Sequence, residues 1–153
     1  MRSIRETTFT LPLSPAAALT LFTPEGERRW AGEDWDPVYP VPGAQNDDSS
    51  PGTVFTTESE GETSVWIVVD RTHDLMRYTR VRPGHNAGTV TVTCSPSQRG
   101  GECEVRVRYD VTALSQAGMG FVQALEHDHR SFIHDWQDEI LQALNDESGS
   151  HPR

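Results

Sequence analysis

The chain has 153 residues, a formal net charge of −10 at neutral pH and a sequence pI near 4.9. This charge argues against nucleic acid and anionic membrane as partners, because both are bound through clustered Lys and Arg. The sequence has no apolar run of about 18 residues and no apolar signal segment near its start, so we expect no membrane insertion and a cytoplasmic location. The length suits a single domain, residues 1–153, with a core that could enclose a cavity.

The first third of the chain predicts one strand, two short helices and an irregular segment. Residues 3–13 alternate loosely between apolar and polar side chains, as strands do. Pro15 and Pro24 each follow a Ser or Thr that can cap a helix, so short helices should begin at both prolines. The first should end at Phe22 and the second should carry Trp30. Residues 31–52 are rich in Pro, Gly, Asn and Asp and should be irregular, apart from one short strand near 38–41.

From Gly52 onward the pattern indicates an antiparallel meander. Turn-forming clusters separate five segments of β-branched and aromatic residues. The predicted strands are residues 53–58, 63–70, 75–82, 88–95 and 102–112.

The last two strands can be aligned by their apolar alternation. Placing Cys94 opposite Cys103 sets Val92 opposite Val105 and brings the apolar side chains to one face. We therefore expect the two cysteines to be cross-strand neighbours, and both to be reduced thiols. Short turns carried back along the meander add further residues to this face: Trp66, Val68, Met76, Tyr78 and Arg80.

Residues 115–145 predict a long amphipathic helix. Apolar residues recur at steps of three and four, while Gln, His, Arg and Asp fill the opposite side. Ser115 can cap the first turn, although Gly118 and Gly120 weaken it. Residues 146–153 continue no apolar stripe and are expected to form a disordered tail. The expected stripe comprises Ala117, Phe121, Val122, Leu125, Phe132, Ile133, Trp136, Ile140, Ala143 and Leu144.

This order of elements predicts an α+β fold in which a curved antiparallel sheet wraps around the long C-terminal helix. It resembles the START/Bet v1-like (SRPBCC) superfamily, the helix-grip proteins that include polyketide cyclases and lipid-transfer domains. The resemblance covers residues 4–145 and is carried by marks of the fold and of one bacterial branch of it. These marks are LFTPEGERRW at 21–30, GTVF at 52–55, RYTRV at 77–81 before Pro83-Gly84, and YDVTALS at 109–115.

The resemblance implies a deep pocket between sheet and helix, commonly used for an apolar or aromatic small molecule. Six residues are expected to line it and to bind the ligand: Trp66, Tyr78, Arg80, Tyr109, His129 and Trp136. His129 lies on the centre line of the apolar stripe, where it could bind a ligand or act as a base, or could be a core histidine paired with Tyr78, Tyr109 or a backbone carbonyl.

The other candidates have structural alternatives as well. Arg80 could hold a carboxylate or an enolate, or could pair with Asp70 or Glu58. The four aromatic residues could be core residues, and they form a binding site only if the pocket is open.

The sequence predicts neither a metal nor another cofactor. His127 and His134 do not have the spacing of a zinc motif, and no Cys-x-x-Cys, nucleophile elbow or phosphate-binding loop occurs. A solvated polar face explains the two histidines more simply.

Three hypotheses for function follow, and the sequence leaves open whether the protein is an enzyme. The first is binding of a hydrophobic or aromatic small molecule. The second is a polyketide cyclase or dehydrase in which Arg80 or Tyr78 polarises a carbonyl and His129 moves a proton. The third is a co-chaperone-like interaction protein with a partner or homodimer surface on the outer face of the sheet, formed by Phe55, Val65, Ile67 and Val81.

Overall fold

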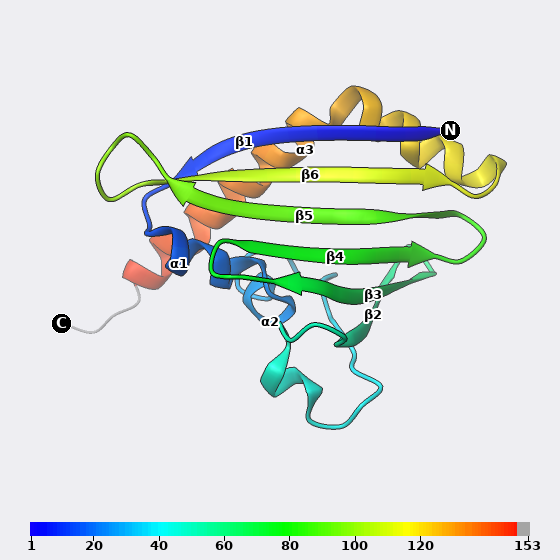
Figure 1. Cartoon of the computed structure of the whole chain (residues 1–153), viewed down its shortest axis with the longest axis horizontal. Helices are drawn as coiled ribbons and strands as arrows, with labels where there is room; N and C mark the ends of the chain where they lie inside the picture. Colours follow the sequence, from blue (N-terminus) through cyan, green and yellow to red (C-terminus); the bar gives the residue numbers. More distant parts are fainter. Residues whose placement is uncertain (150–153) are drawn as a thin grey trace.

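The computed structural model describes residues 1–149, which form one six-stranded sheet, a long helix and several short helical segments (Figure 1). The strands are β1 (Arg2–Leu11), β2 (Val54–Ser59), β3 (Glu62–Arg71), β4 (Leu75–Arg82), β5 (Asn86–Pro96) and β6 (Cys103–Ala113). The helices are α1 (Pro15–Leu19), η1 (Thr20–Phe22), α2 (Pro24–Glu27), η2 (Ala44–Asp47) and α3 (Gln116–Gly149).

The sheet is antiparallel throughout, with the strand order β1-β6-β5-β4-β3-β2. In Figure 1, α3 lies behind this sheet and runs from the end of β6 toward α1. The helix packs mainly against β1, less against β6 and least against β5. The α+β helix-grip fold predicted from the sequence is therefore confirmed.

The short helices begin where the Ser-Pro and Thr-Pro pairs predict. The Ser14 hydroxyl accepts a hydrogen bond of 3.2 Å from the Ala17 N–H, and the Thr23 hydroxyl accepts one of 2.9 Å from the Gly26 N–H. The second helix ends at Glu27, so Trp30 follows it in a turn. The strand expected near 38–41 is reduced to a single bridge between Val38 and Thr56.

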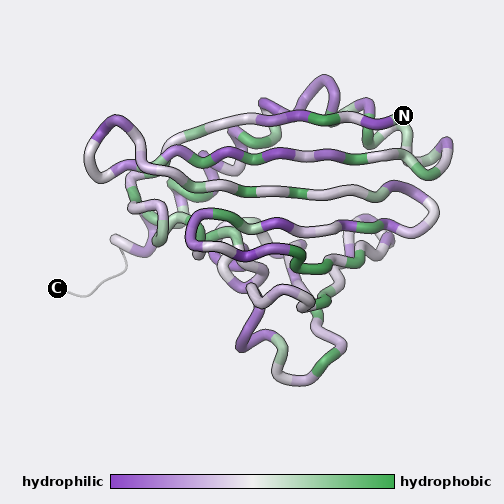
Figure 2. Tube along the Cα trace, in the orientation of Figure 1, coloured by the Kyte–Doolittle hydropathy of each residue, from purple (hydrophilic) through white to green (hydrophobic). Residues whose placement is uncertain are grey.

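The predicted pairing of β5 with β6 has the correct face and the wrong register. Cys94 lies opposite Val105, and Cys103 lies opposite Pro96, so the cysteines are offset by two residues. Because side chains alternate with a period of two, a shift of two residues keeps every apolar residue on the same face, and the apolar pattern cannot detect it. Figure 2 shows this alternation along β6. Both thiols are free and buried.

The assignment of Phe55 to the outer face is wrong. Its side chain is buried and lies opposite Trp66, on the face that packs against the core. The cause is the tight turn between β2 and β3, in which Glu60 and Gly61 both have positive φ and Ser59 pairs with Glu62. This turn places odd-numbered residues of β2 opposite even-numbered residues of β3.

The buried stripe of α3 is narrower than predicted, and the helix is longer. Ala117 is exposed and Phe132 is 42% exposed, whereas Val122, Ile133 and Ile140 are fully buried. The helix continues to Gly149, so residues 146–149 are helical, and 150–153 of the expected tail lie outside the described residues. None of the helices in the described part of the chain is both long and apolar enough to span a membrane.

The first turn of α3 is held against the β4–β5 connection by a close backbone contact. A Cβ atom at Gly118 would lie 1.7 Å from the backbone oxygen of His85, whereas one at Gly120 would meet no atom within 4 Å. Only a glycine at position 118 therefore allows this approach.

The two glycines make a matched test of this contact. Gly118→Ala should reduce the free energy of unfolding by about 1–3 kcal/mol, because the methyl group forces the helix away from His85. Gly120→Ala, on an exposed part of the same turns, should increase it by about 0.5–1 kcal/mol through helix propensity. Urea denaturation measures both changes, and equal effects of the two substitutions would contradict this packing.

Candidate functional site

A pocket with a volume of about 430 Å³ lies between the sheet, α3 and the segment that follows α2. Nine aromatic side chains contribute to its lining, and all four tryptophans of the sequence are among them. The aromatic residues are Phe22, Trp30, Trp35, Trp66, Tyr78, Tyr109, Phe121, Phe132 and Trp136.

Three of the tryptophans have indole N–H groups that are already bonded within the protein. What they offer to a ligand is therefore ring surface. Trp30 donates to the Leu21 carbonyl at 2.8 Å, Trp35 to the Pro24 carbonyl at 2.9 Å, and Trp66 to the Thr57 hydroxyl at 3.0 Å. Neighbouring rings support one another, with 5.4 Å between the centroids of Trp30 and Trp136 and 5.6 Å between those of Trp35 and Trp66. The pocket wall is therefore built from rings that are fixed in place.

Five of the six residues expected to line the pocket do line it, and His129 does not. Trp66, Tyr78, Arg80 and Tyr109 reach it from the sheet and Trp136 reaches it from α3. The sequence did not predict Trp30 and Trp35 as pocket residues, because no local pattern in the irregular segment indicates where it folds back onto the sheet.

Arg80 is a charged group among aromatic rings. Its Cζ atom lies 4.8 Å from the ring centroid of Phe121 and 5.6 Å from that of Trp66. Nη1 donates a 2.9 Å hydrogen bond to the Asn86 side-chain oxygen, and no carboxylate within residues 1–149 pairs with the guanidinium. The expected alternative partner Asp70 instead binds Arg77 at 2.7 Å. Burial lowers the pKa of Arg80, although a guanidinium keeps its proton at neutral pH.

The two tyrosines of the pocket differ in what their hydroxyl groups do. Tyr78 donates a 2.6 Å hydrogen bond to the Phe22 carbonyl and so ties η1 to the sheet. The hydroxyl of Tyr109 has no hydrogen-bond partner among the described residues, and only 6% of the residue is exposed. Burial raises the pKa of Tyr109; Arg80 opposes that rise and Glu27 adds to it, so both charges act on this hydroxyl.

His129 lies at the contact between α3 and β1. Its Nδ1 shares a 2.9 Å hydrogen bond with the Thr7 hydroxyl, and its ring packs edge-on against Tyr109 at 5.1 Å. The structural alternative for this residue is therefore favoured, with Thr7 as the partner. Nε2 is buried without a hydrogen-bond partner, and burial together with the Arg5 charge lowers the pKa of His129 to about 4.

Four carboxyl groups form an acidic rim on the helical side of the pocket: Glu27 at the end of α2, Asp34 in the following loop, and Asp135 and Glu139 on α3. Burial raises the pKa of Glu27 well above its ordinary value. Burial and repulsion from Asp135 and Asp138 also raise the pKa of Glu139. The sequence offered no signal for Glu27, because its position depends on where α2 packs. Among residues 1–149, no three His, Cys, Asp or Glu side chains are arranged to hold a metal ion.

Comparison with known proteins finds similar folds among solved structures only. No family model and no curated protein matches the sequence. Among solved structures, norcoclaurine synthase from Thalictrum flavum, in complex with dopamine and hydroxybenzaldehyde, is similar with a TM-score of 0.64 and 10% identity, over 100% of this chain and 90% of that one. The protein MLL2253 from Mesorhizobium loti is similar with a TM-score of 0.63 and 12% identity, over 95% of this chain and 97% of that one.

A third similar structure is CalU16 from Micromonospora echinospora, with a TM-score of 0.51 and 14% identity, over 82% of this chain and 78% of that one. At these identities the likeness is one of fold. The chain shares the fold of these structures, which is the helix-grip fold that the resemblance to the START/Bet v1-like superfamily predicted.

The lowered pKa of His129 predicts a specific pH dependence of stability. The unfolded chain takes up this proton near the ordinary pKa of about 6.5 and the folded chain near about 4, so stability is lost as pH falls between these values. The loss should approach about 3 kcal/mol at about 1.4 kcal/mol per pKa unit. His129→Asn should remove this part of the slope in denaturation measured from pH 7 to pH 4, and parallel slopes would contradict the assignment.

Proposed function

We propose that this protein binds an aromatic small molecule in the pocket, with an oxygen atom of the ligand at Arg80. The observation that carries the proposal is the unneutralised guanidinium of Arg80 in an aromatic wall. A volume of about 430 Å³ lies within the range of about 300–1,000 Å³ typical of small-molecule sites.

The aromatic wall would supply most of the affinity. Removing apolar surface from water contributes about 25 cal/mol per Å², and fixed rings lose little conformational entropy when a ligand stacks on them. The bonded indole N–H groups of Trp30, Trp35 and Trp66 need no partner from the ligand. This wall favours a flat apolar body over a strongly polar one.

Arg80 would set the orientation of the ligand. Its faces lie against Phe121 and Trp66, and one of its five N–H groups binds Asn86. The remaining donors can bind a carbonyl, phenol or carboxylate oxygen, and such a bond is strong where water is excluded. The free hydroxyl of Tyr109 lies within the electrostatic reach of this charge.

The geometry favours binding over the cyclase or dehydrase mechanism considered from the sequence. His129 does not line the pocket, so the residue expected to move a proton is at the wrong place. Tyr78 could not polarise a carbonyl without giving up its bond to Phe22. Cytoplasmic location stays a proposal, supported by two free buried thiols that suit a reducing compartment.

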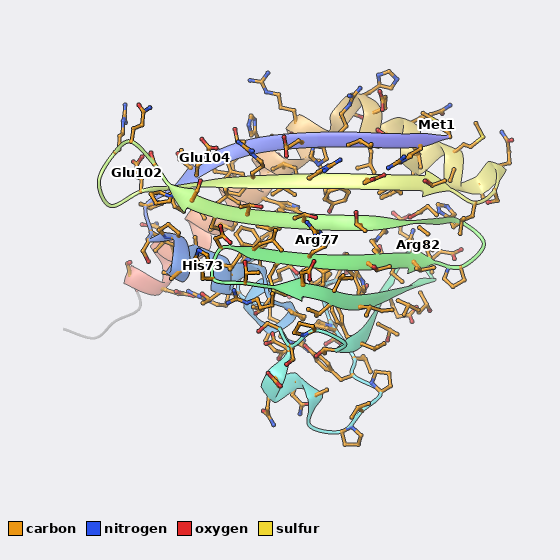
Figure 3. The ribbon with its side chains drawn as sticks, viewed as in Figure 1. Met1, His73, Arg77, Arg82, Glu102 and Glu104 are labelled. Carbon is orange, nitrogen blue, oxygen red and sulfur yellow. The ribbon has the colours of Figure 1, made fainter. Side chains whose placement is uncertain are left out.

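The proposal predicts different effects for two arginines of the same strand. Arg80→Met should weaken binding of 2-naphthol at least about tenfold, since a hydrogen bond to a charged group contributes about 1.5–3 kcal/mol. Arg77→Met is the control, because Arg77 pairs with Asp70 on the outer face of β4 and does not line the pocket; Figure 3 labels it near the middle of the strand.

Binding can be followed by quenching of the four tryptophans, all of which line the pocket. We expect saturable quenching in the wild type and in Arg77→Met. Absence of saturable binding in the wild type, or equal affinities for Arg80→Met and Arg77→Met, would contradict the proposal.

A further inference from the structure

Four of the five carboxyl groups that line the pocket lie on the helical side, whereas both of its arginines lie on the sheet. Arg80 and Arg82 reach it from β4, whereas the acidic rim defined above faces it from α2, the following loop and α3. Asp34, Asp135 and Glu139 are exposed and Glu27 is half-buried. A ligand that enters past the rim therefore meets carboxylates first and the guanidinium of Arg80 deeper inside.

The rim has no cation of its own. None of its four carboxyl groups has a hydrogen bond or an ion pair within the described part of the chain. The two arginines that follow α2 are engaged elsewhere: Arg28 binds Glu25 and Asp36, and Arg29 binds Glu147 at 2.7 Å. The rim consequently carries an excess of negative charge at the pocket opening.

The backbone of Glu27 is held in place by hydrogen bonds and close packing. The N–H of Glu27 donates to the Thr23 carbonyl at 2.9 Å, and its carbonyl accepts from the N–H groups of Trp30 and Ala31. Gly26 packs so closely that a Cβ atom there would lie 1.9 Å from the Thr20 oxygen, so α2 cannot shift without disturbing η1. The backbone that carries Glu27 is thus fixed beside the pocket by contacts on both sides.

The pocket lining around Glu27 contains aromatic, acidic and basic side chains. The titratable and charged groups that share the pocket lining with it are Tyr78, Arg80, Arg82 and Tyr109 from the sheet, Glu58 at the end of β2, Asp34 from the loop, and Asp135 and Glu139 from α3. Trp30 and Trp136 line the same side of the pocket and are in ring contact. Carboxylates beside aromatic faces form an environment that attracts an organic ammonium group.

We propose that the ligand is an aromatic amine, whose ammonium group binds Glu27 and the acidic rim while its ring lies among the tryptophans and its oxygen reaches Arg80. This inference deepens the proposed function and rests on it. Tyr109 is 6% exposed and lines the pocket, and its hydroxyl has no partner among residues 1–149, which is an independent sign that the pocket receives a polar group of a ligand. A single molecule with a cationic end and an oxygen end would complement both sides of the pocket.

Binding should be linked to proton release. A cation stabilises the ionised form of Glu27, so an amine that stays protonated to a pKa near about 10 should bind more tightly as pH rises from 5 to 8. Because the pKa of Glu27 is raised in the free protein, this change in affinity should occur at a higher pH than the titration of an ordinary glutamate. Replacement by Gln removes the titration and keeps the shape of the side chain.

The test compares three ligands of similar size by isothermal titration calorimetry with the whole protein: tyramine, uncharged 4-ethylphenol and anionic 3-(4-hydroxyphenyl)propionate. We expect tyramine to bind at least about tenfold more tightly than 4-ethylphenol at pH 7.5, as a charged hydrogen bond would provide. Titrations at a series of pH values from 5 to 8, in buffers of different ionisation enthalpy, should show a range of pH in which protons are released with tyramine and none with 4-ethylphenol.

The matched variants are Glu27→Gln and Glu33→Gln, which make the same chemical substitution. Glu33 is an exposed residue of the neighbouring loop and does not line the pocket. Glu27→Gln should remove most of the preference for tyramine over 4-ethylphenol, whereas Glu33→Gln should keep the preference of the wild type.

Two kinds of result would overturn the inference alone. These are binding of tyramine no tighter than that of 4-ethylphenol, and equal loss of the preference in the two variants, which would indicate long-range attraction without contact. Failure of all three ligands to bind would overturn the proposed function as well.

Discussion

The position of α3 across the sheet is the constraint on which the pocket depends. The helix is held at its start by the contact of Gly118 with the His85 backbone, in its middle by β1, and near its end by the ion pair between Arg29 and Glu147. At β1, the Ser3 hydroxyl and the Arg5 guanidinium both donate to Glu126, and Thr7 bonds His129. Because these attachments draw the helix toward the β1 edge, the core-facing side of β3 and β4 is covered by α2 and the loop after it. The pocket lies between these two covers.

This arrangement separates two kinds of polar group on α3. Glu126 and His129 face β1 and connect the helix to the sheet, so their chemistry is used for structure. Asp135 and Glu139 lie toward α2, line the pocket and have no such bonds in residues 1–149. These exposed carboxyl groups are available to a ligand that enters the pocket. The difference between the two sets is what directs attention to the acidic rim as a binding surface.

Much of the fold and part of the site could be read from local patterns. The alternation in β3 to β6 assigns Trp66, Tyr78, Arg80 and Tyr109 to one face, and the capped prolines locate α1 and α2. The β5–β6 register is displaced by two residues because alternation reports a face and not a position along the strand. Phe55 is on the opposite face from the one assigned because the length of the turn between β2 and β3 sets which residues pair. His129 was placed correctly in the buried stripe, but periodicity alone could not say that this part of the stripe meets β1.

The sequence by itself therefore determined the elements, the buried faces and the helix-grip architecture, because caps, turns and apolar periods depend on neighbours a few residues apart. The tertiary structure decided which residues meet in the pocket. Glu27, Trp30 and Trp35 reach it only because α2 packs against η1 and the chain folds back over β3 and β4, and His129 is excluded only because α3 packs against β1. The contact of Trp35 with Trp66 and that of Thr7 with His129 join residues far apart in the sequence, and no local pattern records them.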